Sequence, residues 1–162
     1  MDLLDFLDEH SVFAGRHAAD AYEAIELSGR PLVDTGVAEE RYIQAMQEGL
    51  REFGPYMVLA PGIAMPHARP EGGAIGPGFS VVTLDEPVKF GHQHNDPVDL
   101  LVAFSATDKE AHVTVLKQLA LLFGDQSGVE RIRAATSDQQ LIEVLRELVG
   151  AMDPDDRRGA SD

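Results

Sequence analysis

The chain has 162 residues, of which 28 are acidic and 13 are basic, and its formal charge is −15. This length predicts one domain. Because a strongly negative surface repels nucleic acids and anionic membranes, neither nucleic acid nor membrane is an expected partner. The absence of cysteine excludes disulfides, thiol catalysis and cysteine-bound zinc, which leaves His, carboxylate, hydroxyl and Arg side chains for chemistry.

The beginning of the chain carries no sign of secretion. Residues 1–9 contain four acidic side chains and no basic segment of the kind that opens a signal peptide. No stretch approaches the roughly 18 consecutive apolar residues that a membrane helix needs. We therefore expect a cytoplasmic protein without direct membrane insertion.

Three helices and a short strand are predicted in the first half of the chain. The elements expected there are a short acidic helix at 2–8, a short strand at 11–15, and helices at about 18–32 and 39–53. Gly29 and Pro31 are taken as stop signals for the first long helix, and Gly54-Pro55 for the second. A loop region rich in proline and glycine follows.

The second half predicts the sheet and then more helices. Its expected elements are strands at 79–84, 87–90 and 98–106, a helix ending at Phe123, a short helix at 126–134 and an amphipathic helix around 141–149. The strand at 98–106 is almost continuously apolar, which is typical of a central strand. Thr107 and Glu110 have the spacing of a capping box at the start of the helix that follows.

Helices on both sides of a small sheet predict an α/β fold, a three-layer α/β/α sandwich. The expected domain covers residues 1–151, and the polar segment 152–162 is expected to be a disordered tail. No glycine-rich strand-to-helix turn of the kind that binds nucleotides is present, so no nucleotide cofactor is expected.

His67 is the first candidate for chemistry. Pro66 and Pro70 restrict the backbone around it, so the imidazole is presented on a stiff loop. A neutral imidazole is nucleophilic near neutral pH, and Arg69 offers donors that match phosphate oxygens, as could the N–H of Ala68. This pattern suggests phosphoryl chemistry, although a histidine packed in a tight turn fits the same residues equally well.

His112 is the second candidate. It lies about one turn into the helix after the central strand, where N–H groups and the helix dipole favour an anion. The His67 loop could reach this end of the sheet, so the two histidines could share a phosphate. An exposed histidine without a role has the same spacing.

A third set of side chains could bind a metal ion such as zinc. His92 and His94 stand close to Asp96 and Asp99, and all four are suitable ligand types. Because the segment is polar and contains Asp96-Pro97, an ordinary turn is the better interpretation.

The chain resembles the enzyme IIA components of the bacterial sugar phosphotransferase system, of the mannitol–fructose type, with the ascorbate-type branch most similar. The resemblance covers about residues 1–150, and its most specific part is the Pro66-His67 pair with Arg69. It rests on Gly54-Pro55-Tyr56, the segment VLAPGIAMPHAR from Val58 to Arg69, Gly78-Phe79, Val82-Thr83-Leu84, and Asn95-Asp96-Pro97-Val98-Asp99.

The resemblance implies a fold with a small mixed β-sheet flanked by helices and a specific function. His67 would be phosphorylated by the phosphocarrier protein HPr and would pass the phosphoryl group to a IIB component, and through it to the membrane component IIC. His112 would bond the phosphate and Arg69 would offset its charge. Neither metal nor cofactor is implied. Ala68 stands where the family often has glycine.

Several alternatives remain open from the sequence. Arg51 is a second candidate for an active-site arginine. A regulatory phosphoprotein of the same fold would act by binding other proteins, and a metal-dependent hydrolase would use His92 and His94. The sequence specifies neither the transported sugar nor whether the protein forms a homo-oligomer.

Overall fold

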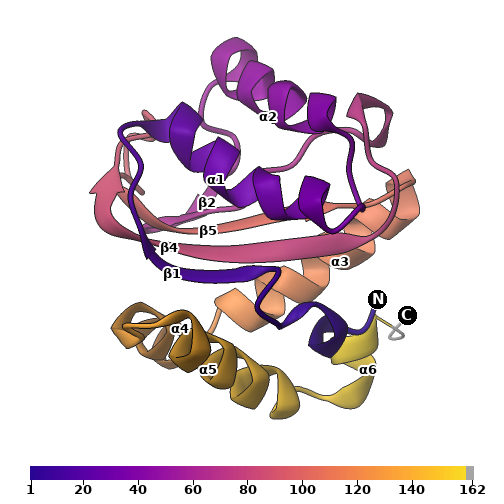
Figure 1. Cartoon of the computed structure of the whole chain (residues 1–162), viewed down its shortest axis with the longest axis vertical. Helices are drawn as coiled ribbons and strands as arrows, with labels where there is room; N and C mark the ends of the chain where they lie inside the picture. Colours follow the sequence, from indigo (N-terminus) through magenta and orange to yellow (C-terminus); the bar gives the residue numbers. More distant parts are fainter. Residues whose placement is uncertain (160–162) are drawn as a thin grey trace.

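The computed structural model describes residues 1–159 and is built on one mixed five-stranded sheet, shown in Figure 1. Its strands are β1 (Val12–Arg16), β2 (Val58–Ala60), β3 (Ile63–Ala64), β4 (Gly78–Val88) and β5 (Val98–Ser105). They lie in the order β1-β4-β5-β3-β2. The pairs β1–β4 and β3–β5 are parallel, whereas β4–β5 and β2–β3 are antiparallel.

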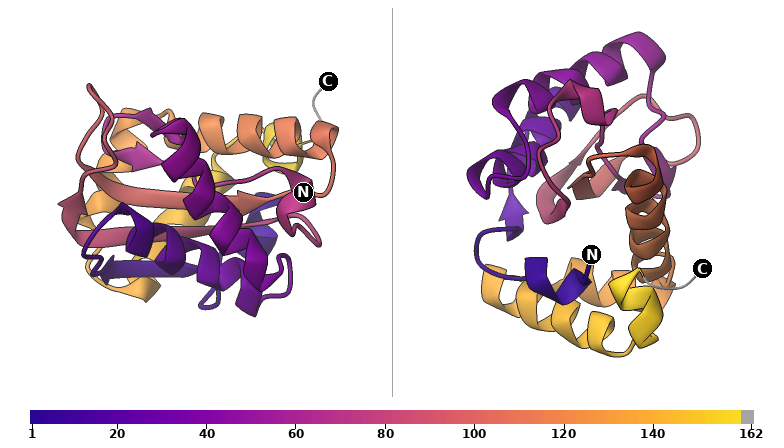
Figure 2. Two further views of the ribbon diagram at one scale, coloured as in Figure 1. Left: turned by 90° about the horizontal axis from the view of Figure 1, so that it is seen from above. Right: turned by 90° about the vertical axis from the view of Figure 1, so that its right-hand side faces the viewer.

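Helices cover both faces of the sheet, which confirms the predicted three-layer α/β/α fold (Figures 1 and 2). The helices are η1 (Leu3–Phe6), α1 (Ala21–Asp34), α2 (Glu40–Phe53), η2 (Pro70–Gly72), α3 (Lys109–Phe123), α4 (Gln126–Ala134), α5 (Asp138–Gly150) and α6 (Pro154–Arg158). Within residues 1–159, none of them has the length and apolar character needed to cross a membrane.

The central strand β5 divides the apolar core into two parts. Leu100, Val102 and Phe104 pack on the side of α3, α4 and α5, whereas Leu101 and Ala103 pack on the side of α1 and α2. Successive side chains of a strand point to opposite faces, so a strand buried on both faces is apolar throughout. The prediction of a central strand at 98–106 is confirmed within one residue.

The first long helix begins and ends later than predicted. Asp20 caps it by accepting the N–H of Glu23 at 2.9 Å, and the helix continues through both expected stop signals to Asp34. Gly29 lies where α1 crosses α2, and a Cβ there would be 2.8 Å from Met46 and 2.9 Å from Ile43. The glycine therefore permits close packing and does not end the helix.

Two other local predictions are wrong. The separate strands at 79–84 and 87–90 are one strand, β4, whose register against β5 shifts between Thr83 and Val88. Pro87 lies in this irregular part, where its missing N–H costs no ladder hydrogen bond. The cap of α3 is Asp108, not Thr107, because the Asp108 carboxylate accepts the N–H of Ala111 at 2.8 Å.

The segment after Met152 differs from the expected disordered tail. Residues Pro154–Arg158 form α6, which lies beside the amino terminus in Figure 1. Gln118 on α3 donates to the carbonyl oxygens of Met1 at 2.7 Å and Arg157 at 2.8 Å, so the amino terminus and α6 are both bonded to α3. Residues 160–162 of the predicted tail lie outside the described residues.

Gly29→Ala should lower the free energy of unfolding by about 1–3 kcal/mol, because the added methyl group overpacks the contact between α1 and α2. Without this steric conflict, replacing glycine by alanine inside a helix would raise the free energy of unfolding. Gly150→Ala is the matched control, since Gly150 ends α5 and a Cβ there meets no atom within 4 Å. Urea unfolding of both variants measures the difference, and equal stability of the two would contradict the packing explanation.

Candidate active site

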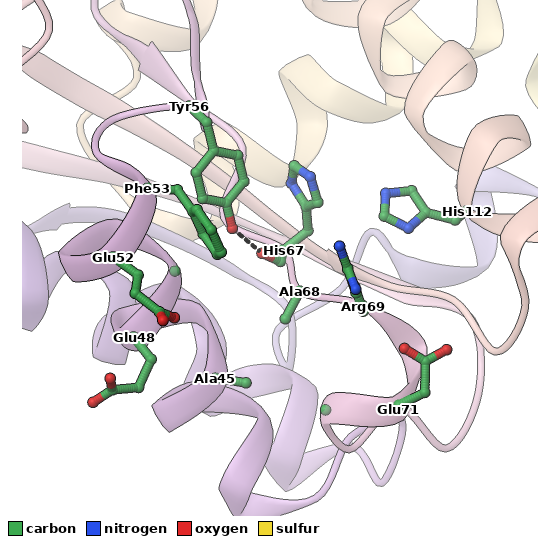
Figure 3. Close-up of a pocket in the computed structure, with 12 residues that line it drawn as sticks. Ala45, Glu48, Glu52, Phe53, Tyr56, His67, Ala68, Arg69, Glu71 and His112 are labelled. Carbon is green, nitrogen blue, oxygen red and sulfur yellow. Dashed lines mark hydrogen bonds between the residues drawn. The ribbon is translucent and has the colours of Figure 1, made fainter.

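His67 and His112 lie at the same edge of the sheet because the strands that precede them are parallel. The His67 loop follows β3 and α3 follows β5, and the carboxyl ends of adjacent parallel strands meet at one edge. The rings of His67 and His112 are 5.1 Å apart between centroids and nearly perpendicular, at 88°. Together with Arg69 they line one pocket of about 690 Å³, shown in Figure 3. The structure thus brings together the three predicted site residues.

One hydrogen bond sets the tautomer of His67. Its Nδ1 lies 2.7 Å from the carbonyl oxygen of Met65, and since a carbonyl only accepts, Nδ1 carries the hydrogen. In the neutral ring Nε2 is then unprotonated and holds the free electron pair. Within residues 1–159, no hydrogen bond occupies Nε2. The ring therefore offers Nε2 as its nucleophilic nitrogen.

Aromatic rings surround the imidazole of His67. Phe104, at the end of β5, stacks on it with 4.8 Å between centroids and 21° between planes. The ring of Tyr56 meets it edge-on at 5.5 Å, and the ring of His112 lies 5.3 Å from that of Phe104. Phe104 is fully buried, and both imidazoles pack against its ring.

Burial lowers the pKa of both histidines. Desolvation is the main cause at His67, partly opposed by the hydrogen bond to Met65, and the nearby His112 lowers its pKa further. Desolvation also lowers the pKa of His112. A lowered pKa keeps an imidazole neutral at neutral pH, which is the state that a nucleophile requires.

Two tyrosine hydroxyls hold the backbone that carries His67. Tyr56 donates to the carbonyl oxygen of His67 at 2.8 Å, the dashed line in Figure 3. The N–H of Ala68 donates to the Tyr42 hydroxyl at 3.1 Å, so the expectation that this N–H would bind phosphate is wrong for the structure as described. Within residues 1–159 only glycines have positive φ, so Ala68 fits its loop without the backbone conformation that favours glycine.

The expected anion site at the start of α3 lies outside the pocket, whose lining includes His112 but not Lys109–Ala111. The carboxylate of Asp108 accepts the N–H of Ala111, and the N–H of His112 donates to the carbonyl oxygen of Asp108 at 2.9 Å. The capping carboxylate thus takes one N–H group at this end of the helix and places a negative charge beside the helix dipole, which disfavours a phosphate there. His112 therefore contributes its side chain to the pocket, and the helix terminus does not.

Arg69 is the cationic side chain of the pocket lining, and three carboxylates line the same pocket. Arg69 is exposed and makes no ion pair with residues 1–159. The acidic lining residues are Glu48, Glu52 and Glu71. Arg51, the alternative arginine, pairs with Glu48 and lies over the Tyr22 ring at 5.4 Å, outside the pocket lining.

The residues around His92 are used to build a loop. His92 Nδ1 accepts the N–H of His94 at 3.2 Å and of Asn95 at 3.0 Å, and the Asp96 carboxylate accepts three backbone N–H groups. Asp99 pairs with Arg133 at 3.0 Å. Among residues 1–159, no group of three or more His, Asp or Glu side chains is arranged to hold a metal ion.

Phe104, Tyr42 and Tyr56 are parts of the site that reasoning from sequence did not assign. Tyr42 and Phe104 follow the apolar patterns of α2 and β5, so their spacing marks them only as core residues. Tyr56 stands within the motif that carries the family resemblance, and this was the one available signal.

Comparisons with known proteins agree on one family. Residues 5–148 match the family model of the phosphoenolpyruvate-dependent sugar phosphotransferase system, EIIA 2. The ascorbate-specific PTS system EIIA component of Escherichia coli strain K12 is 41% identical over 147 residues, which covers 90% of this chain and 96% of the relative.

Two solved structures show the same fold. One is the mannitol-specific cryptic phosphotransferase enzyme IIA of Escherichia coli, with a TM-score of 0.82, 37% identity and coverage of 91% of this chain and 99% of the other. The second is the complex of enzyme IIAMTL and phosphorylated enzyme IIBMTL from Escherichia coli, with a TM-score of 0.74, 31% identity and coverage of 86% and 96%.

The pKa of His67 should lie below its ordinary value of 6.5, and the pKa of His17 should lie above it. Burial disfavours the charged form of His67, whereas His17 is hydrogen-bonded to Asp85 at 3.0 Å. Because the unfolded chain then binds a proton at His67 more readily, this group lowers the free energy of unfolding as the pH falls from 6.5 through the lowered pKa. An NMR titration measures both values, and a His67 pKa at or above that of His17 would contradict the burial of the ring.

Proposed function

The chain belongs to the EIIA 2 family of the phosphoenolpyruvate-dependent sugar phosphotransferase system, and from this premise we propose that it carries the phosphoryl group on Nε2 of His67. The observation that supports this atom is the 2.7 Å hydrogen bond from Nδ1 to the Met65 carbonyl oxygen, which leaves the electron pair on Nε2. The neutral, half-buried ring lines an open pocket that a phosphorylated donor can approach.

The bonds that form and break in the transfer involve only the two histidines that exchange the phosphoryl group. The electron pair of His67 Nε2 forms the new P–N bond while the P–N bond of the donor breaks, and the bonding electrons return to the donor imidazole. Transfer to the next component repeats the exchange with His67 as the leaving group. Catalysis then consists of positioning and electrostatics.

His112 and Arg69 are proposed to act on the phosphoryl group. The His112 ring faces His67 at 5.1 Å between centroids, so its side chain can donate a hydrogen bond to a phosphate oxygen on Nε2. Arg69, which has no carboxylate partner in residues 1–159, supplies a positive charge at the same pocket. The arriving dianion should also raise the pKa of His112, because a nearby negative charge favours the imidazolium.

The partners follow from the family. The phosphocarrier HPr is proposed as the donor and a IIB component as the acceptor, and the related complex named above contains phosphorylated enzyme IIB. Ascorbate is the proposed sugar, because the curated relatives are ascorbate-specific EIIA components. We place the reaction in the cytoplasm, where the phosphoenolpyruvate that feeds the relay is made.

Incubation with phosphoenolpyruvate, enzyme I and HPr should place an acid-labile, alkali-stable phosphate on the wild-type protein. His67→Ala should take up no label, because it lacks the accepting nitrogen. His94→Ala is the matched control and should be labelled like wild type, since His94 lies in the loop beyond the site. An unlabelled wild-type protein or a fully labelled His67→Ala variant would overturn the proposal.

His112→Ala should slow phosphoryl transfer in both directions by roughly a hundredfold, which is the usual cost of removing one hydrogen bond to a transition-state oxygen. Rapid-quench measurement of transfer from phospho-HPr and to IIB tests this. His10→Ala, which removes an exposed histidine on the amino-terminal segment, is the control. Unchanged rates in a folded His112→Ala protein would remove His112 from the mechanism.

A further inference from the structure

The Tyr42 hydroxyl connects three parts of the molecule beneath the His67 loop. Tyr42 lies in the first turn of α2 and is 1% exposed. Its oxygen is 2.9 Å from the carbonyl oxygen of Phe104, 3.2 Å from that of Ala68, and 3.1 Å from the Ala68 nitrogen. The helix, the loop and the central strand are thus joined through one phenolic oxygen.

Within residues 1–159, every hydrogen bond of this hydroxyl joins a backbone group of Ala68 or Phe104. A phenol has one hydrogen to donate, and here it faces two carbonyl oxygens, of which that of Phe104 is nearer. The oxygen also accepts the N–H of Ala68. Ala68 is the residue after His67, and Phe104 is the residue whose ring stacks on the His67 imidazole.

A second hydrogen bond completes the link between the loop and β5. The N–H of Phe104 donates to the carbonyl oxygen of Pro66 at 3.1 Å. The residues before and after His67 are therefore both bonded at Phe104, directly at Pro66 and through Tyr42 at Ala68. Removing the hydroxyl would leave the peptide group after His67 with the hydrogen bond from Tyr56 to its carbonyl oxygen but without the bond at its N–H, and it would leave a buried carbonyl oxygen without this donor.

Tyr42 does not take part in proton transfer. Burial raises the pKa of its hydroxyl to about 12, so the proton stays in place over the pH range in which histidine titrates. In addition, the hydroxyl bonds backbone groups and makes no hydrogen bond to either histidine ring. Any effect on phosphoryl transfer must come from the position of the loop.

We propose that Tyr42 is a positioning residue for phosphoryl transfer, whose hydroxyl fixes the loop against β5 so that His67 Nε2 is aligned with the incoming phosphorus. The inference rests on the proposed function, because alignment matters only if His67 is the nucleophile. In-line transfer is sensitive to displacement of the reacting atoms, and a misplacement of about 1 Å costs about a hundredfold in rate.

Tyr42→Phe removes only the hydroxyl and is the direct test. In single-turnover transfer from phospho-HPr, the limiting rate at saturating donor should fall by about tenfold to a hundredfold, with little change in the donor concentration for half-saturation. Tyr22→Phe is the matched control, since Tyr22 lies on α1 outside the pocket lining, and it should keep the wild-type rate. A structural role alone would lower the melting temperature of Tyr42→Phe without changing the limiting rate, and that result would overturn the inference.

Hydrogen exchange of the wild-type protein provides a test that needs no variant. The Ala68 amide, bonded to a buried hydroxyl, should exchange slowly, and exchange at the rate of an unprotected peptide would overturn the inference even if Tyr42→Phe did not fold.

Phosphate labelling of the wild-type protein distinguishes failure of this inference from failure of the proposed function. A labelled wild type beside a Tyr42→Phe protein of full rate overturns only the role of Tyr42, whereas an unlabelled wild type overturns the proposed function and this inference together.

Discussion

The hydrogen bond from His67 Nδ1 to the carbonyl oxygen of Met65 is the interaction on which the chemistry of this site depends. It is 2.7 Å long and lies within a single turn of the loop, so it holds both the tautomer and the orientation of the ring. The same bond leaves Nε2 as the ring nitrogen with a free electron pair. Burial works in the same direction, because a ring with a lowered pKa stays neutral and keeps its electron pair.

That bond is effective only because the loop is held in place by the sheet. β3 and β5 are parallel neighbours, so the residues after them meet at one edge although His67 and His112 are far apart in the sequence. Both imidazoles pack against Phe104 at the end of β5. The hydroxyls of Tyr42 and Tyr56 form hydrogen bonds with the peptide group that follows His67. The sheet and the helix α2 therefore contact the His67 ring and its backbone directly.

Sequence reasoning predicted most elements, and the structure brings its three candidate site residues to one pocket, because both have local signals. α2 and β5 follow clear apolar periods, and His67 stands between two prolines. Two of the errors arose where a tertiary contact overrides a local signal. Gly29 permits the close packing of α1 on α2 and does not end α1. The Ala68 N–H is hydrogen-bonded to the Tyr42 hydroxyl and is not available to a phosphate in this structure. A sequence pattern cannot indicate such partners, since they come from distant segments.

The most direct test of this account is a nitrogen-15 NMR spectrum of the phosphorylated protein, which identifies the ring nitrogen bonded to phosphorus. The account predicts phosphorus on Nε2 of His67, with the hydrogen retained on Nδ1 and its bond to Met65 intact. Phosphorus on Nδ1 of His67, or on any other histidine, would contradict it, because the Met65 carbonyl would then have no role in selecting the nucleophile.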